Sequence, residues 1–155
     1  MTTSLEDHRT GLRATYVGSS PGQRLKVALD RLGYPTHEPN LLITRVSAVE
    51  ALARSLLVHR IAAAGENIEK VYARYRLTGP EALLEAYFTS IGSGSALHFF
   101  GQERWEQFQH AVQYRHLLVH ECTYLHPETA MPLIETCREI LLQLARSAGL
   151  PTGEI

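Results

Sequence analysis

The chain has 155 residues, of which 45% are hydrophobic and 20% are charged, and its formal net charge is −1 with His neutral. This composition is that of an ordinary folded protein and excludes intrinsic disorder as its general state. The near-zero charge excludes broad, non-specific attraction to nucleic acid, so a nucleic-acid partner would need a local binding site. We expect a single domain over residues 1–155, with residues 1–20 at its periphery.

The expected location is the cytoplasm. The N-terminal segment 1–16 carries acidic residues and no apolar core, so we expect no signal peptide. No apolar run approaches the roughly 20 residues of a membrane span, and we expect no membrane partner. Cys122 and Cys137 are too few for a disulfide framework and lack zinc-binding spacing, so we expect reduced thiols in or near the core.

Helix-forming residues dominate the chain, and no segment alternates as a strand would. Ser4 is a candidate N-cap of a short first helix, which Gly11 weakens. Ser20 and Pro21 predict the start of a helix that runs to Leu32. Further helices are expected over 41–64, 67–76, 78–91, 102–119 and 129–148, the last with Pro132 in its first turn. Together they predict an all-α, up-and-down helical bundle of five or six helices.

The segment Arg115–His120 (RHLLVH), followed by Glu121, carries the chemistry of this sequence. Arginine binds phosphate bidentately and keeps its charge at any working pH. Histidine gives and takes protons near neutrality. An Arg and a His placed together indicate phosphodiester chemistry, with RNA as the obvious target.

Helix geometry limits how these side chains meet. On an ideal helix His116 and His120 share one face, while Arg115 and His120 lie roughly 140° apart around the axis and about 7.5 Å apart along it. They converge if Arg115 curls round, if the helix ends near His120, or if a two-fold partner unites them. Residues 117–119 are expected to anchor the segment in the core.

These residues resemble the Arg-x4–6-His motif of HEPN domains, the helical superfamily named for higher eukaryotes and prokaryotes and for nucleotide binding. In many members a polar residue follows the Arg, and His116 fits that position. The motif also lies on the penultimate long helix, with one amphipathic helix after it, as in that superfamily.

An earlier segment strengthens the likeness. Residues 46–57 (VSAVEALARSLL) are similar to a core helix of HEPN domains, and Glu50 stands where some members carry an acidic residue facing the site. The resemblance covers residues 41–148 at the level of pattern, although only the six-residue motif is specific.

The resemblance implies a metal-independent endoribonuclease that needs no cofactor and cleaves single-stranded RNA by 2′-OH attack, leaving a 2′,3′-cyclic phosphate. Arg115 would hold the scissile phosphate, His120 would act as general acid or base, and His116 would orient His120 or the phosphate. Glu50 would orient or charge-balance Arg115, and Glu121 would support the site.

The same resemblance implies a toxin, defence or stress-response role, a homodimer whose two motifs line one cleft, and an antitoxin or another partner protein. Some toxin members extend the motif with a Tyr two residues after the His, and that Tyr is nucleotidylated. Cys122 occupies this position here, so silencing by that modification is not expected.

Two other functions remain open. One is a non-catalytic module that binds RNA, a nucleotide or a protein through the same cleft. Separately, Arg54, one turn after Glu50, could pair with it and make Glu50 structural. The other is a metal-dependent hydrolase built on His116 and His120, whose i, i+4 spacing suits two ligands. It would need a third ligand from His59, His98 or Glu50.

A cysteine nucleophile is a further alternative, with Cys122 paired to His120 or His126. Nothing in the sequence marks Cys122 as activated, so a packed thiol is expected instead.

Overall fold

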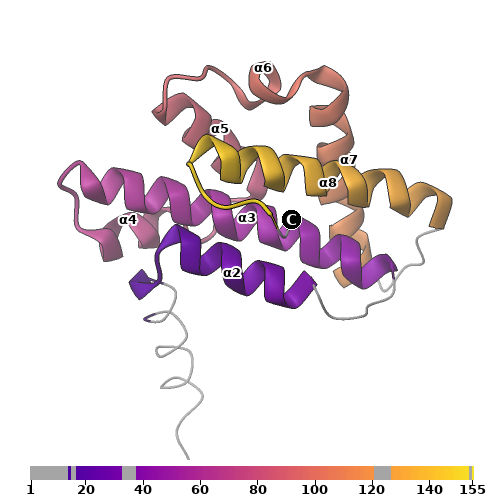
Figure 1. Ribbon diagram of the computed structural model, residues 1–155, viewed down its shortest axis with the longest axis horizontal. Helices are drawn as coiled ribbons and strands as arrows, with labels where there is room; N and C mark the ends of the chain where they lie inside the picture. The colour runs from indigo at the N-terminus through magenta and orange to yellow at the C-terminus, as the bar shows by residue number, and fades with distance from the viewer. Residues whose placement is uncertain (1–13, 15–16, 33–37, 121–126, 154) are drawn as a thin grey trace, which may run out of the picture.

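The computed structural model describes residues 14, 17–32, 38–120, 127–153 and 155, and this part of the chain contains helices and no strand. Its helices, labelled as in Figure 1, are α2 (Pro21–Leu32), α3 (Glu38–Ala63), α4 (Ile68–Tyr75), α5 (Pro80–Ser90), α6 (Ala96–Phe100), α7 (Gln102–His120) and α8 (Pro127–Ser147). The all-α prediction is confirmed, although the described residues alone form seven helices rather than five or six. None of these helices is both long and apolar enough to cross a membrane. The short helix predicted after Ser4 lies outside the described residues.

The helix absent from the prediction is α6. Its five residues are too few to display a helical period in the sequence. The Ser95 hydroxyl accepts a hydrogen bond of 3.0 Å from the His98 backbone N–H and so begins the helix. Gly101 ends it at a φ of 84°, in the left-handed region that favours glycine. Phe100 is buried and stacks on Trp105, which ties α6 to α7.

Helix α3 is the centre of the fold, because it contacts α2, α4, α5, α7 and α8 (Figure 1). Its apolar residues are buried at Leu42, Val46, Val49, Ala53, Leu56 and Leu57, and Ile61 is partly buried. Additional burial at Ala48, Leu52 and Val58 shows that α3 is covered on more than one side. A helix covered in this way shows no single apolar face.

The helix starts follow the capping signals in the sequence. The Gln23 N–H donates to the Ser20 hydroxyl at 3.2 Å, and the Ser20 N–H donates to the Gln23 side-chain oxygen at 2.8 Å. This reciprocal pair is a capping box, and it confirms the predicted start of α2. At α4, the Asn67 side chain accepts from the Lys70 N–H at 3.1 Å.

The start of α8 differs from the prediction. The helix begins at Pro127, so Pro132 lies inside it rather than in its first turn. A proline is favourable at the first position of a helix, because the N–H it lacks would have no partner there. Pro132 removes one donor from the interior of α8 on its exposed side.

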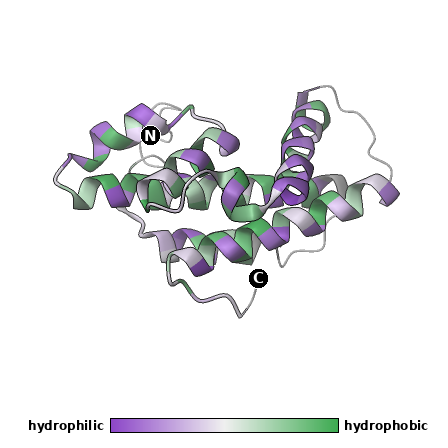
Figure 2. Ribbon diagram, turned by 90° about the horizontal axis from the view of Figure 1, so that it is seen from above, coloured by the Kyte–Doolittle hydropathy of each residue, from purple (hydrophilic) through white to green (hydrophobic). Residues whose placement is uncertain are grey.

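Helix α7 crosses α3 and α8 instead of running along them (Figure 1). Its first half is anchored by the buried residues Trp105, Phe108, Ala111 and Val112. Its last turns project from the layer formed by α3 and α8 (Figure 2). Leu117 is 39% exposed and Val119 is 54% exposed, so the prediction that residues 117–119 anchor the segment in the core is wrong for these two, and only Leu118 packs against the core.

Candidate active site between α3 and α7

The motif residues meet at one pocket between α3 and α7. Arg115, His116, Val119 and His120 of α7 line it together with Ile43 and Ser47 of α3, and its volume is about 240 Å³. Arg115 and His120 therefore face the same space within one chain, despite their separation around the helix axis. The pocket lies close to the end of α7, as one of the three expected routes to convergence requires.

Glu50 holds the guanidinium of Arg115. The Arg115 Nη1 donates to Glu50 Oε2 at 2.6 Å, and the two side chains are only 17% and 20% exposed. The contact expected between Glu50 and Arg115 is thus present. At this burial, solvent and salt screen the attraction between the two charges less than in a surface salt bridge. The stronger attraction restricts where the Arg115 side chain can lie.

Arg54 binds the other oxygen of the same carboxylate. Its Nη2 donates to Glu50 Oε1 at 2.6 Å, and Arg54 is 12% exposed. The structural pairing that we weighed as an alternative for Glu50 therefore exists beside the contact with Arg115. Burial alone would raise the pKa of the Glu50 carboxyl, but hydrogen bonds and attraction from Arg115 and Arg54 outweigh it and hold the pKa below its ordinary value.

The two histidines of the motif stack at the surface. The His116 and His120 rings lie 5.9 Å apart between centroids with planes 17° apart, as the shared helix face predicts. Both residues are exposed. Exposed imidazoles beside a cation are accessible to a phosphate ester that enters the pocket.

The third ligand that a metal site would need is not found in the described part of the chain. No three His, Cys, Asp or Glu side chains lie together there. The His59 ring is 2.9 Å from the backbone oxygen of Ser19, and Glu50 is bound by two arginines. His98 lies on α6, at the other end of α7.

Several predicted residues lie elsewhere. Glu121, Cys122 and His126 fall outside the described residues. Cys137 is fully buried on α8, and burial raises the pKa of its thiol to about 12. It is therefore a packed, protonated thiol at neutral pH, as expected from the sequence.

Sequence reasoning missed Ser47 and Ile43. Together with Glu50 and Arg54 they occupy one stripe of α3, at offsets of four, seven and eleven residues from Ile43. A serine and two charged residues on one stripe of the central helix form a signal that the sequence already contained. That signal becomes readable only when α3 is known to be covered on its other sides.

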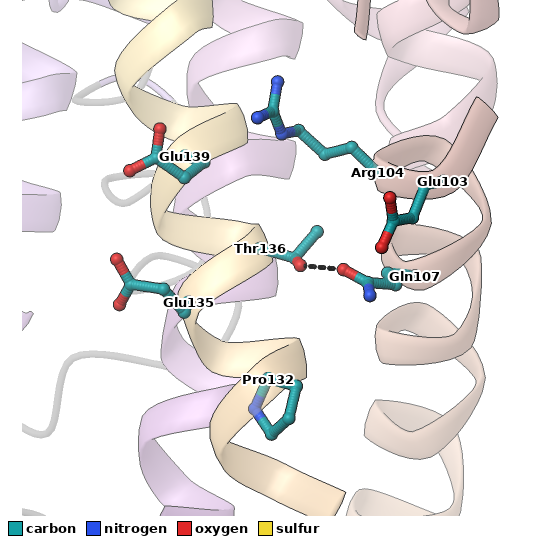
Figure 3. A pocket seen from close by; sticks show the side chains of 7 residues that line it. All are labelled: Glu103, Arg104, Gln107, Pro132, Glu135, Thr136 and Glu139. Atoms are coloured by element: carbon teal, nitrogen blue, oxygen red, sulfur yellow. Dashed lines mark hydrogen bonds between the residues drawn. The ribbon is translucent and has the colours of Figure 1, made fainter. Parts of the chain in front are cut away.

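A second pocket lies further back along α7, where that helix packs on α8 (Figure 3). Its volume is about 360 Å³, and its lining residues are Glu103, Arg104, Gln107, Pro132, Glu135, Thr136 and Glu139. Thr136 of α8 and Gln107 of α7 point toward each other, and the Thr136 hydroxyl donates to the Gln107 side-chain oxygen (Figure 3). Three carboxylates against one guanidinium make this pocket acidic.

Comparison with known proteins adds no assignment, because no protein-family model, curated protein or solved structure matches this chain.

Proposed function

We propose that this protein is a metal-independent endoribonuclease of the HEPN type, acting on single-stranded RNA at the pocket between α3 and α7. The observation that carries the proposal is that Arg115, His116 and His120 line one pocket. The motif on the penultimate long helix, with one further helix after it, supports an HEPN-like bundle. A toxin, defence or stress-response role goes with this proposal, as does control by an antitoxin or another partner protein.

Arg115 binds the scissile phosphate in this account. Its Nη1 donates to Glu50, and in the described part of the chain its other guanidinium N–H groups donate to no side chain or carbonyl. These groups are therefore available for phosphate oxygens and for the charge that develops on them in the transition state. Glu50 limits the motion of Arg115, so the Arg115 side chain loses less conformational entropy when substrate binds.

The histidines move the protons of the reaction. The ribose 2′-OH gives its proton to a base and bonds to phosphorus, and the bond from phosphorus to the 5′-oxygen breaks as that oxygen receives a proton. The products are a 2′,3′-cyclic phosphate and a 5′-hydroxyl end, without a metal or an oxidant. His120 serves as the acid or the base, and His116, stacked on it, orients the imidazole or the phosphate.

A second copy of the chain completes this proposal. Leu117 and Val119 leave an apolar surface exposed beside the pocket, at the end of α7. A two-fold partner packed on this surface would bury it and bring two motifs together.

The test is cleavage of a single-stranded RNA oligonucleotide in the presence of EDTA. We expect the purified protein to cut it, and we expect His120→Ala to remove cutting while the variant keeps the thermal melting of the wild type. Wild-type protein that cuts only after metal is added, or His120→Ala that cuts at the wild-type rate, would contradict the assignment.

A second function is favoured by one observation. Arg115 is already paired with Glu50, which is itself bound to Arg54, and such a network also suits a site that only binds. A non-catalytic module would retain RNA without turning it over, and His120→Ala would then leave binding unchanged. Equal binding by the wild type and this variant, with no product from either, would select the second function.

A further inference from the structure

Arg54 joins the candidate site to the turn between α4 and α5. Its Nε donates to the Tyr75 backbone oxygen at 3.2 Å, and its Nη2 donates to the Thr78 backbone oxygen at 2.9 Å and to Glu50 Oε1 at 2.6 Å. One guanidinium therefore binds a carbonyl oxygen at the end of α4, a second carbonyl oxygen in the turn that follows, and one carboxylate of α3. A planar donor with this many partners has little freedom to move.

The consequence for Glu50 is that both of its oxygens are bound. Arg54 holds Oε1 and Arg115 holds Oε2. A carboxylate held on one side only can rotate and carry Arg115 with it. With Arg54 bound to it, Glu50 holds the Arg115 guanidinium at the edge of the pocket.

The consequence for charge is equally direct. Glu50 alone would neutralise Arg115, and the pair would then offer no net attraction to an anion. With Arg54 included, two guanidinium groups face one carboxylate, so the cluster keeps one net positive charge. All three side chains are 20% exposed or less, so this charge is weakly screened at the pocket.

The chain contains a matched comparison for Arg54. Arg60, six residues further along α3, donates from Nε and Nη2 to the Ser90 backbone oxygen at the end of α5, at 3.0 and 2.8 Å. Both arginines cap the end of a neighbouring helix, but Arg60 is exposed and does not touch Glu50. If capping were the whole role of Arg54, the two residues would behave alike.

We propose that Arg54 is a positioning residue of the pocket between α3 and α7: it fixes Glu50 so that Arg115 stays at the pocket edge, and it keeps the cluster net positive toward an RNA phosphate. The choice of RNA phosphate as the ligand rests on the proposed function.

The binding test uses a single-stranded 2′-O-methyl RNA oligonucleotide, which cannot undergo 2′-OH attack. We expect Arg54→Gln to bind it about fivefold more weakly than wild type at low salt, the effect of losing one interaction at the upper end of the surface ion-pair range. Its affinity should also depend less on salt concentration. Arg60→Gln should bind as the wild type does.

The second variant separates charge from position. Arg54→Lys keeps the charge, but one ammonium group cannot reproduce the planar fork toward Glu50 and two carbonyl oxygens. We expect wild-type affinity for the 2′-O-methyl oligonucleotide and a lower kcat on unmodified RNA, with KM unchanged. If Arg54→Gln does not melt cooperatively and is therefore not folded, Arg54→Lys is the decisive variant. A wild-type kcat in Arg54→Lys would then overturn the proposal.

Two further results would overturn it: wild-type binding, salt dependence and kcat in a folded Arg54→Gln, or an equal loss in Arg60→Gln. If wild-type protein binds RNA without cutting it, the catalytic proposal fails, and the binding comparison still decides the role of Arg54.

If the wild-type protein does not bind RNA, the decisive readout is the NMR signal of the Arg115 Nε–H. A change of this signal in Arg54→Gln but not in Arg60→Gln supports positioning, and an unchanged signal refutes it.

Discussion

Two pockets lie along α7, and they differ in the sign of their charge. The one between α7 and α8 is lined by Glu103, Glu135 and Glu139 with one guanidinium, whereas the one between α3 and α7 has Arg115 and two imidazoles and no carboxylate in its lining. The acidic pocket is the larger of the two. Size therefore does not distinguish the candidate site, whereas the sign of the charged groups in the lining does, because a cationic lining suits the phosphodiester that we propose as substrate.

The pockets also differ in how their charges are held. Around the acidic pocket, Glu135 is 56% exposed and pairs at the surface with Arg138, which is 37% exposed. Around the cationic pocket, the Glu50–Arg115 pair is 20% exposed or less. Exposed pairs contribute little, whereas the partly buried pair restricts the position of its cation. A fixed cation is what a site acting on phosphate requires.

A large effect on cleavage is expected when the arginine of the cationic pocket is replaced, and little effect when the arginine of the acidic pocket is replaced. Arg115→Ala should lower kcat/KM for RNA cleavage by roughly 10²–10³, since it removes a donor to the transition-state oxygens. Arg104→Ala, on the same helix but in the acidic pocket, should leave cleavage within about twofold of wild type. Steady-state rates on one oligonucleotide measure both, and equal losses in the two variants would remove the distinction between the pockets.

The histidines offer a second matched pair on α7. His120→Ala should lower kcat by roughly 10²–10⁴, the usual contribution of a general acid or base. His110→Ala removes an exposed imidazole that does not line the pocket and should have no effect. A pH profile of kcat that loses one limb only in His120→Ala would support the assignment, and identical profiles would count against it.

A smaller effect is expected on stability. Glu50→Gln leaves two arginines without their carboxylate and should lower the free energy of unfolding by about 1–3 kcal/mol at neutral pH. Urea denaturation at pH 7 measures this difference. A variant as stable as the wild type would show that the network contributes nothing to folding.

The same variant carries a pH dependence with a definite sign. The pKa of Glu50 is lowered from 4.5 in the folded protein, so the unfolded chain binds the proton more readily. Its stabilising contribution is complete above about pH 4.5 and is lost as pH falls through the folded-state pKa. The gap between the wild type and Glu50→Gln should therefore narrow in acid. A gap that widens below pH 4.5 would contradict this pairing.

The smallest effect should follow from weakening the acidic pocket. Glu139→Gln removes one negative charge from a pocket that RNA does not contact in our proposal. Affinity for the 2′-O-methyl oligonucleotide should therefore rise by less than about twofold. Fluorescence anisotropy at low salt measures this change. A large gain would mean that RNA passes over this pocket as well.

The sequence predicted the helices well where capping residues and apolar stripes agree, as at Ser20 and along α3. It failed at α6, which is shorter than two turns, and at α8, where two prolines compete as the starting signal. Both failures concern local signals that are too short or too similar to rank by pattern alone.

For the site, the motif predicted which residues of α7 share a pocket. It did not predict the residues of α3 that line the same pocket, Ile43 and Ser47. Ser47 faces the motif because α7 crosses α3, and no periodicity encodes a crossing between distant helices. The exposure of Leu117 and Val119 has the same origin, since their burial depends on how far α7 extends past its neighbours. The sequence pattern therefore identified the pocket residues on α7, whereas those on α3 follow only from how the two helices pack.

The proposed reaction depends on a nucleophile that belongs to the substrate. The most direct measurement compares an RNA oligonucleotide with the same sequence carrying a single 2′-deoxy residue at the cleavage position, both in EDTA. We predict 2′,3′-cyclic phosphate and 5′-hydroxyl ends from the RNA, and no cut at the substituted position although the oligonucleotide still binds. Cleavage at the deoxy position, or products with 5′-phosphate ends, would contradict the claim that Arg115 and His120 direct 2′-OH attack at this pocket.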